Sequence, residues 1–399
     1  MTPPPGAAPR GSLLDPLALV GAWLEGLPRS PLGYAETLGA DWAELGDAGR
    51  TMLCQSRLAY VFAHAGLLGD PLAAAEGRVA IAAMQDHFWS DEARGWIQSI
   101  DAEGLALNDR IDSYDQAFGL LALAWAFRAT GDAGLKAVAL EALAGLDAAA
   151  GARGGAYEGY PEWRRSRAPA VAEHLGGPPA TPRRQNPHMH LLEAFLAWHG
   201  ADPTGPWLER AGSIVELARR RFIDPVDGTL GEFFDEDLAP ASGEAGSRRE
   251  PGHHFEWVWL LRRWQEASGD PGAFDMAGRL YRFACDKGRD SDGLAFDAVD
   301  PVGRLVEEGK LLWPQTELLK AHLAWWEWTG DEAAKRAAIE CLGAISTNYF
   351  LPGSALFRNR LARDRSPLPV PALSRVLYHL FLALVEAERV LGPQADARC

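Results

Sequence analysis

Histidine is the side chain whose ordinary pKa lies nearest neutral pH, so the ten histidines of this 399-residue chain are the first candidates for proton transfer. Half of them stand alone in ordinary helical or loop surroundings, and we expect structural roles for these: His64, His87, His174, His199 and His322. The other five lie in three denser groups of polar and aromatic residues. These groups are where the sequence predicts chemistry.

The first group runs from Asn186 to Glu193. Pro187 suits the first turn of a helix, with Asn186 as its N-cap. On that helix Asn186, His190 and Glu193 share one polar stripe at positions i, i+4 and i+7, whereas His188 points to another side. A cap followed by a buried hydrogen-bonded pair explains this pattern as well as a binding pocket does.

The second group is Gly-His-His-Phe-Glu-Trp, beginning at Gly252. His253 and Glu256 lie one helical turn apart, so we expect the carboxylate to orient the imidazole and raise its basicity. Trp257 is also one turn from His253, and His254 points elsewhere. Neither this histidine pair nor the pair of the first group has a cluster of acidic or cysteine ligands to complete it, so no metal site is predicted.

Further polar residues occur near the starts of other apolar helical segments. Trp313 and Glu317 are one turn apart at one helix start, and Tyr378-His379 begins the last long helix after a proline-rich loop. Arg57 and Tyr114 are each embedded in an apolar helical stretch. Individually these residues are ordinary, and what could bring them together is the arrangement of the helices.

Regular turns in the chain indicate that arrangement. Long apolar segments stop at a glycine, usually followed by aspartate, every 61 to 69 residues. Glycine is favoured just past a helix C-terminus and aspartate is a good cap for the next helix, so each stop reads as a tight turn between two helices. The six stops are Gly69-Asp70, Gly131-Asp132, Gly200 (with Asp202), Gly269-Asp270, Gly330-Asp331 and Gly392-Pro393.

Six turns predict six helical hairpins, which must stack to bury their apolar faces. An open superhelix is one solution, but a closed all-α ring, an (α/α)6 barrel, is favoured because neither end looks like a polar capping repeat. Short β-hairpin loops are expected at one end, at the glycine-rich segments that begin at Gly95, Gly154, Gly228 and Gly293. Because the inner helices of such a barrel share one direction, polar residues near their starts converge on one cavity.

Composition limits the partners and the compartment. The net charge of −15 argues against a nucleic-acid surface and against binding to an acidic membrane. The 15 tryptophans suit core packing, with some left for stacking against sugars. Four cysteines spaced far apart fit a reducing, cytoplasmic location rather than a disulfide framework. We expect a disordered tail at residues 1–12 and a single catalytic domain over residues 13–399.

Taken in order, these residues resemble the N-acylglucosamine 2-epimerase superfamily over nearly the whole chain. The resemblance rests on Arg57, Asp112-Ser-Tyr114-Asp115, Asn186-Pro-His-Met-His190, Gly252-His253-x-x-Glu256, Trp313-x-x-x-Glu317 and Tyr378-His379. It implies an (α/α)6 barrel, no cofactor, and His253 and His379 as the catalytic pair. It also implies that the sugar is bound or oriented by Arg57, Tyr114, Asn186, His190, Glu256, Trp313 and Glu317. Members of the family often place an aromatic residue just before the final Tyr-His, and the segment Leu373–Leu377 has none.

The chemistry of the residues agrees with this resemblance. Isomerising an aldose, or inverting its C2, requires a base of near-neutral pKa to remove the proton next to the aldehyde. Negative charge then develops on the enediolate oxygens, where Arg57 with Asn186 or His190 could stabilise it. No metal is needed in that scheme. If the proton returns to C1 the product is a ketose, and if the second histidine protonates the opposite face of C2 the product is the epimer.

The sequence therefore predicts a cofactor-independent isomerase of a D-mannose-type aldose and its D-fructose-type ketose. A 2-epimerase of a mono- or disaccharide is the main alternative. An inverting glycoside hydrolase using Glu256 with Glu317 or Asp115, and a non-catalytic sugar-binding protein, are the lesser ones. The net charge disfavours a phosphorylated sugar, although a local cluster such as Arg183-Arg184 could override it. A homodimer is left open.

Overall fold

The computed structural model describes residues 13–46, 48–153, 156–161, 163–164 and 183–392. The predicted tail at residues 1–12 lies outside these residues. None of the described helices is both long and apolar enough to cross a membrane. Three of the four cysteines are described, and all three are free thiols: Cys54, Cys285 and Cys341.

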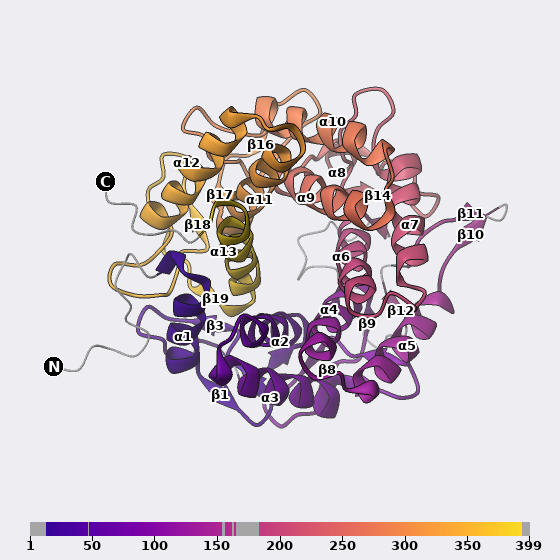
Figure 1. The fold of residues 1–399 in the computed structure, drawn as a ribbon, viewed down its shortest axis with the longest axis vertical. Helices are drawn as coiled ribbons and strands as arrows, with labels where there is room; N and C mark the ends of the chain where they lie inside the picture. The colour runs from indigo at the N-terminus through magenta and orange to yellow at the C-terminus, as the bar shows by residue number, and fades with distance from the viewer. Residues whose placement is uncertain (1–12, 47, 154–155, 162, 165–182, 393–399) are drawn as a thin grey trace.

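Within the described residues, six inner helices follow one another around a central axis. They form a closed ring (Figure 1). They are α2 (Met52–Leu67), α4 (Ser113–Thr130), α6 (Asn186–Ala201), α9 (Pro251–Ser268), α11 (Leu312–Thr329) and α13 (Leu377–Leu391). Each contacts the next in this order, and α13 contacts α2, which closes the ring. In five of them, all except α13, the apolar residues show only weak periodicity, because side chains on most sides of these helices are buried.

Six outer helices cover the ring. They are α1 (Pro16–Gly26), α3 (Pro71–Phe88), α5 (Ala133–Asp147), α7 (Trp207–Leu217) with a π-helical extension over Ala218–Phe222, α10 (Gly272–Lys287) and α12 (Glu332–Asn348). Two short elements complete the helical part, α8 (Gly243–Ser247) and a 3-10 turn at Ser374–Val376. The predicted (α/α)6 barrel is confirmed.

The glycine–aspartate stops make the turns as predicted in most of the hairpins. Gly131, Gly269 and Gly330 end their helices in the left-handed region, with φ of 69°, 73° and 70°, where a Cβ would be strained. Asp132 and Asp331 cap the helices that follow. Two of the six stops differ from the prediction.

Gly200 lies inside α6, and the C-cap of that helix is Asp202. Gly392 follows α13, but no described helix comes after it. The helix that covers this part of the ring is α1, from the other end of the chain, which packs on both α13 and α2. The sixth hairpin is therefore formed by the two ends of the chain.

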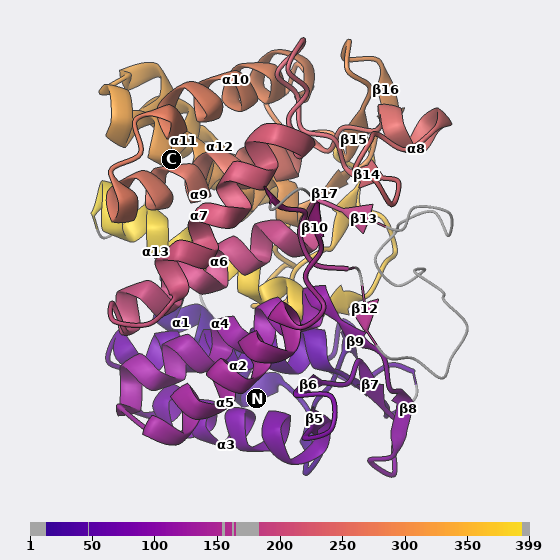
Figure 2. The same ribbon diagram turned by 90° about the vertical axis from the view of Figure 1, so that its right-hand side faces the viewer.

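Short antiparallel strands gather at the end of the ring where the inner helices begin (Figure 2). They are β1 (Arg29–Ser30), β2 (Gly33–Tyr34), β3 (Thr37–Leu38), β4 (Arg50–Thr51), β5 (Trp89–Ser90), β6 (Gly95–Trp96), β7 (Ser99–Ile100), β8 (Ala106–Asn108), β9 (Ile111–Asp112), β10 (Ala152–Arg153), β11 (Ala156–Tyr157), β12 (Trp163–Arg164), β13 (Arg183–Arg184), β14 (Phe233–Phe234), β15 (Ala298–Val299), β16 (Leu305–Glu307), β17 (Lys310–Leu311), β18 (Arg360–Leu361) and β19 (Ala372–Leu373). The strands β4, β9, β13 and β17 lead directly into inner helices. Pairing with partner strands therefore fixes where those helices start.

Candidate active site

A cavity of about 350 Å³ lies at the end of the barrel where the inner helices begin. All six inner helices contribute to its lining. Eight of the nine residues predicted for the site line it: Arg57, Tyr114, Asn186, His190, His253, Glu256, Trp313 and His379. The ninth, Glu317, is fully buried behind His379 and does not line the cavity.

His379, near the start of α13, is paired with Glu317 of α11. Its Nδ1 lies 2.9 Å from Glu317 Oε1, so the imidazole donates its Nδ1–H and keeps a lone pair on Nε2. Burial lowers the pKa of His379 well below its ordinary value, and the positive charges of Arg57 and Lys320 add to this effect. The imidazole is therefore neutral at pH 7, in the form that can accept a proton.

His253, near the start of α9, is held by different carboxylates from the one predicted. Its Nδ1 lies 2.8 Å from Glu232 Oε2 and 3.4 Å from Glu250 Oε2. The expectation that Glu256 orients this ring is wrong, because the Glu256 side chain faces His190 instead. Burial lowers the pKa of His253, but the negative charges of Glu232 and Glu250 outweigh it and raise the pKa to about 9.

His253 is therefore protonated at pH 7, whereas His379 is neutral. Opposite protonation states in one cavity are what a general acid and a general base require. The indole ring of Trp313 is close to both, with its centroid 4.9 Å from that of His253 and 5.8 Å from that of His379.

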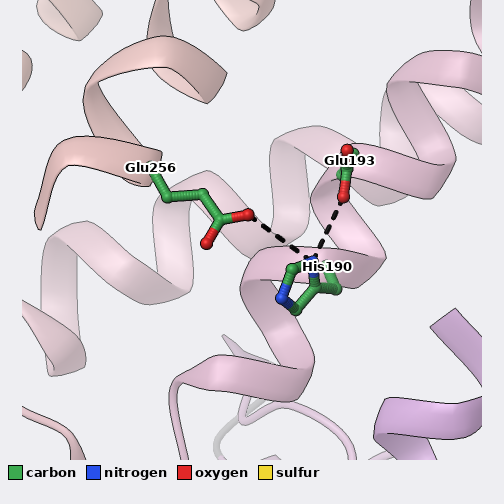
Figure 3. A group of neighbouring side chains, drawn as sticks. All are labelled: His190, Glu193 and Glu256. Atoms are coloured by element: carbon green, nitrogen blue, oxygen red, sulfur yellow. Dashed lines mark hydrogen bonds and ion pairs between the residues drawn. The ribbon is translucent and has the colours of Figure 1, made fainter. Parts of the chain in front are cut away.

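A third imidazole, His190, lies between two carboxylates (Figure 3). Its Nδ1 is 3.1 Å from Glu193 Oε2 on the same helix and 3.8 Å from Glu256 Oε1 on α9. The polar stripe predicted on α6 is therefore confirmed for this pair. With the Nδ1–H donated to Glu193, His190 Nε2 is an acceptor, which suits a sugar hydroxyl.

Glu256 lines the cavity as an unpaired carboxyl group. Neither of its oxygens has a hydrogen-bond partner among the described residues. Burial raises its pKa well above the ordinary value, and the nearby charge of Glu317 raises it further. Glu256 is therefore a neutral acid, able to donate a hydrogen bond to a ligand oxygen.

Among the residues that the structure describes, three sets of histidine and carboxylate donor atoms are compact enough to surround a cation, with all atoms of a set within 4.8 Å of one another. The sets are His190, Glu193 and Glu256; Glu232, Glu250 and His253; and Glu256, Glu317 and His379. In each set the imidazole Nδ1 already hydrogen-bonds a carboxylate. These hydrogen bonds account for the short distances, and we assign none of these residues as metal ligands.

Arg57 and Asn186 present polar groups to the same cavity. Arg57 donates from Nη2 to the Tyr114 hydroxyl at 2.9 Å, and its guanidinium carbon lies 4.2 Å from the centroid of Phe118. Asn186 is the first residue of α6 rather than its cap, contrary to the prediction. Its buried Oδ1 has no partner among the described residues, so it is available to a ligand.

Several residues of the sequence groups have purely structural contacts. His188 Nε2 accepts from the backbone N–H of Tyr160 at 2.9 Å, and His254 Nε2 accepts from that of Leu230 at 3.0 Å. Trp257, which the sequence placed near the chemistry, is buried away from the cavity and donates to Gln185 Oε1 at 2.9 Å. Among the lone histidines, His174 lies outside the described residues.

The site also contains residues that sequence reasoning missed. Glu232 lies in a loop before β14, 21 residues from the histidine that it holds, and no periodicity links the two positions. The wall before the final Tyr-His consists of Leu373, Arg375 and Val376, so the segment without an aromatic residue contributes an arginine to the cavity. Arg184 lines the cavity too, whereas Arg183 donates to the Tyr160 carbonyl at 3.1 Å.

A larger cavity, of about 870 Å³, lies among the C-terminal halves of the inner helices. Its wall includes Trp125, His64 and Arg128. His64 is stacked on Trp125 and hydrogen-bonded to the Tyr60 hydroxyl at 3.0 Å, and burial lowers its pKa to about 3. Neither His253 nor His379 lines this cavity, so size alone does not mark it as the active site.

The chain is a closed (α/α)6 barrel with one protonated and one neutral imidazole in the cavity at the helix starts. Residues 33–383 match the model of the N-acylglucosamine 2-epimerase family, and the chain belongs to this family. The family and its named relatives make the protein a sugar isomerase or 2-epimerase.

Two curated relatives and one solved structure illustrate the similarity. The chain is 34% identical to a mannose-6-phosphate isomerase of Rhizobium meliloti, over 90% of each chain. It is 28% identical to a D-mannose isomerase of Thermobifida fusca, over 78% of this chain and 79% of that one. Its fold matches a sugar epimerase from a ruminal bacterium with a TM-score of 0.85 at 18% identity, over 97% of this chain and 99% of the other.

Proposed function

We propose that this protein interconverts a mannose-type aldose and its fructose-type ketose through a cis-enediolate. The observation that carries the proposal is the pair of imidazoles in one cavity, each with Nδ1 held by a carboxylate and with pKa values shifted in opposite directions. The relatives named as mannose isomerases support the substrate class.

In this proposal Nε2 of the neutral His379 accepts the proton from C2 of the open-chain aldose. The electron pair of the broken C–H bond forms the C1–C2 double bond, and negative charge develops on O1. Arg57 and the neutral carboxyl group of Glu256 stabilise that charge, and the His253 imidazolium supplies a proton to it. His379 then returns its proton to C1 while His253 recovers one from O2, which leaves the ketose.

A 2-epimerase is the second candidate, because His253 is already protonated before the reaction. If its Nε2–H reaches C2 on the face opposite His379, protonation there inverts C2 instead of forming a ketose. The residues required are the same in both reactions. The hydrolase alternative is less well supported. Of its three candidate carboxylates, only Glu256 lines the cavity. Oxygens of Glu256 and Glu317 lie within 4.8 Å of each other, whereas an inverting hydrolase needs its two carboxyl groups roughly 6.5–9.5 Å apart.

The test is to incubate the protein in deuterated water with mannose, mannose 6-phosphate, glucose and cellobiose, and to follow each sugar by proton NMR. Mannose 6-phosphate is included because four arginines line the cavity: Arg57, Arg184, Arg248 and Arg375. We expect fructose, or its 6-phosphate, to form. Deuterium at C2 with inverted configuration would establish the epimerase instead, and shortening of cellobiose would establish a hydrolase.

The pH dependence tests the acid role of His253. Its pKa of about 9 means that activity falls as pH rises through that value, because the imidazolium then loses its proton. Replacing Glu232 by glutamine removes a negative charge that raises this pKa, so the alkaline limb of kcat/KM against pH moves down by about one unit or more. Exposed Glu236, just after β14, is the matched control: Glu236→Gln leaves the limb in place. An unchanged limb in Glu232→Gln would rule out the acid role of this pair.

A further inference from the structure

A lysine is fully buried in the middle of the barrel. Lys320 of α11 has 0% of its surface exposed, and lysine is almost never buried to that extent unless it is paired. Its Nζ lies 2.6 Å from Glu317 Oε2 and 4.2 Å from the centroid of the Trp259 ring. The other oxygen of Glu317 accepts the Nδ1–H of His379. The Lys320 ammonium, the Glu317 carboxylate and the His379 imidazole are therefore linked in series, and the imidazole lines the cavity.

Lys320 itself does not line the cavity, so its effect on a substrate must pass through other residues. Burial lowers its pKa, but the negative charge of Glu317, its nearest partner, outweighs that effect, so the ammonium group stays charged. Charged or titratable groups of the neighbouring inner helices surround Lys320, Glu317 and His379. They are Arg57 on α2, His190 and Glu193 on α6, His253 and Glu256 on α9, and Tyr378 on α13.

Two of the three imidazole–carboxylate pairs of the site, those of His253 and His379, allow a comparison within one protein. In both, Nδ1 lies less than 3 Å from a carboxylate oxygen. At His253 the carboxylate of Glu232 receives its second hydrogen bond from the neutral amide of Gln185, and the imidazole is protonated. At His379 the carboxylate of Glu317 is paired with an ammonium group, and the imidazole is neutral. These two pairs differ in partner and in charge, and His253 also has a second carboxylate, Glu250, 3.4 Å from its Nδ1. In the third pair, His190 with Glu193, burial lowers the imidazole pKa, and the charges of Arg57 and Lys320 add to this effect.

We propose that Lys320 is a positioning residue of this active site, the counter-ion that lets Glu317 orient His379 without protonating it. In a buried site an uncompensated carboxylate would stabilise the imidazolium form of its neighbour. With Lys320 neutralising Glu317, the carboxylate still fixes the ring and its tautomer, while the Nε2 lone pair stays free to take a proton. The catalytic part of this inference rests on the proposed role of His379 as the base.

The test is the titration of His379 by NMR in the full-length protein with labelled histidine, because this readout does not depend on activity. In Lys320→Met we expect the pKa of His379 to rise by at least about one unit above the wild-type value. The acid limb of kcat/KM moves up by the same amount. Lys320→Arg keeps the charge and leaves the titration near that of the wild type. A folded Lys320→Met protein with an unchanged His379 titration would overturn the proposal.

Removing the charge of a buried ion pair can unfold a protein, so a second variant carries the test if Lys320→Met does not fold. In the double variant Glu317→Gln/Lys320→Met both charges are absent, and we expect the pKa of His379 to stay as low as in the wild type. A rise of one unit or more in the double variant would contradict the proposal. If the wild type converts none of the four sugars, the proposed function fails, whereas the titration still decides whether Lys320 controls the charge of His379.

Discussion

Replacing His379 by asparagine lowers kcat by about 10²- to 10⁴-fold, the usual contribution of a positioned general base. The neutral imidazole of His379 lines the cavity, and its Nδ1 is hydrogen-bonded to Glu317 of the Lys320–Glu317 ion pair. Asparagine keeps a group that can hydrogen-bond Glu317 but has no lone pair of suitable basicity. The fold is expected to survive, because Glu317 keeps its ion pair with Lys320.

The measurement is initial-rate kinetics on the substrate identified by NMR, together with circular dichroism and thermal unfolding of the variant. His87→Asn is the matched control, because His87 lies at the C-terminal end of α3, away from the cavity. We expect it to retain wild-type kcat. Exchange of the C2 hydrogen with deuterated water reports the base directly, so a His379→Asn protein that still exchanges C2 at the wild-type rate would refute this assignment.

The ring and its cavity were predictable because local signals repeat along the chain. The clearest stops, Gly131-Asp132 and Gly330-Asp331, have a local cause, a left-handed C-cap followed by a capping carboxylate. Parallel inner helices then bring their starts together without any further information. For this reason eight of the nine predicted site residues line one cavity, although they are spread from Arg57 to His379.

What was not predictable depends on contacts between segments far apart in the sequence. Helical spacing suggested that Glu256 holds His253. In the structure the Glu256 side chain faces His190, and Glu232, from the loop before β14, holds His253 instead. Lys320 carried no signal either, because a single lysine in an apolar helix ordinarily points to solvent. Only the packed barrel shows that it faces Glu317 across one helical turn with no access to water.

The second large effect on kcat is expected from replacing Arg57. The surroundings of its guanidinium group show how its role in catalysis can be tested. Its side chain is 4% exposed, and no described carboxylate lies within ion-pair distance of it. Its guanidinium instead rests against aromatic rings, 4.2 Å from the centroid of Phe118 and 5.0 Å from that of Tyr378. A buried cation without a counter-ion is costly, and negative charge that appears in the cavity only during the reaction would relieve that cost.

Replacing Arg57 by methionine should therefore separate catalysis from stability. We expect kcat to fall by about 10²- to 10³-fold, because the enediolate loses a preorganised positive charge. We expect the Tm to stay the same or to rise, because methionine fills similar volume without a buried charge. Arg128→Met is the matched control: that guanidinium also lies over an aromatic ring, 4.4 Å from the centroid of Trp125, but in the larger cavity. A variant in which kcat and Tm fall together would mean that Arg57 is structural, whereas lost turnover in a fully stable protein places its charge in the transition state.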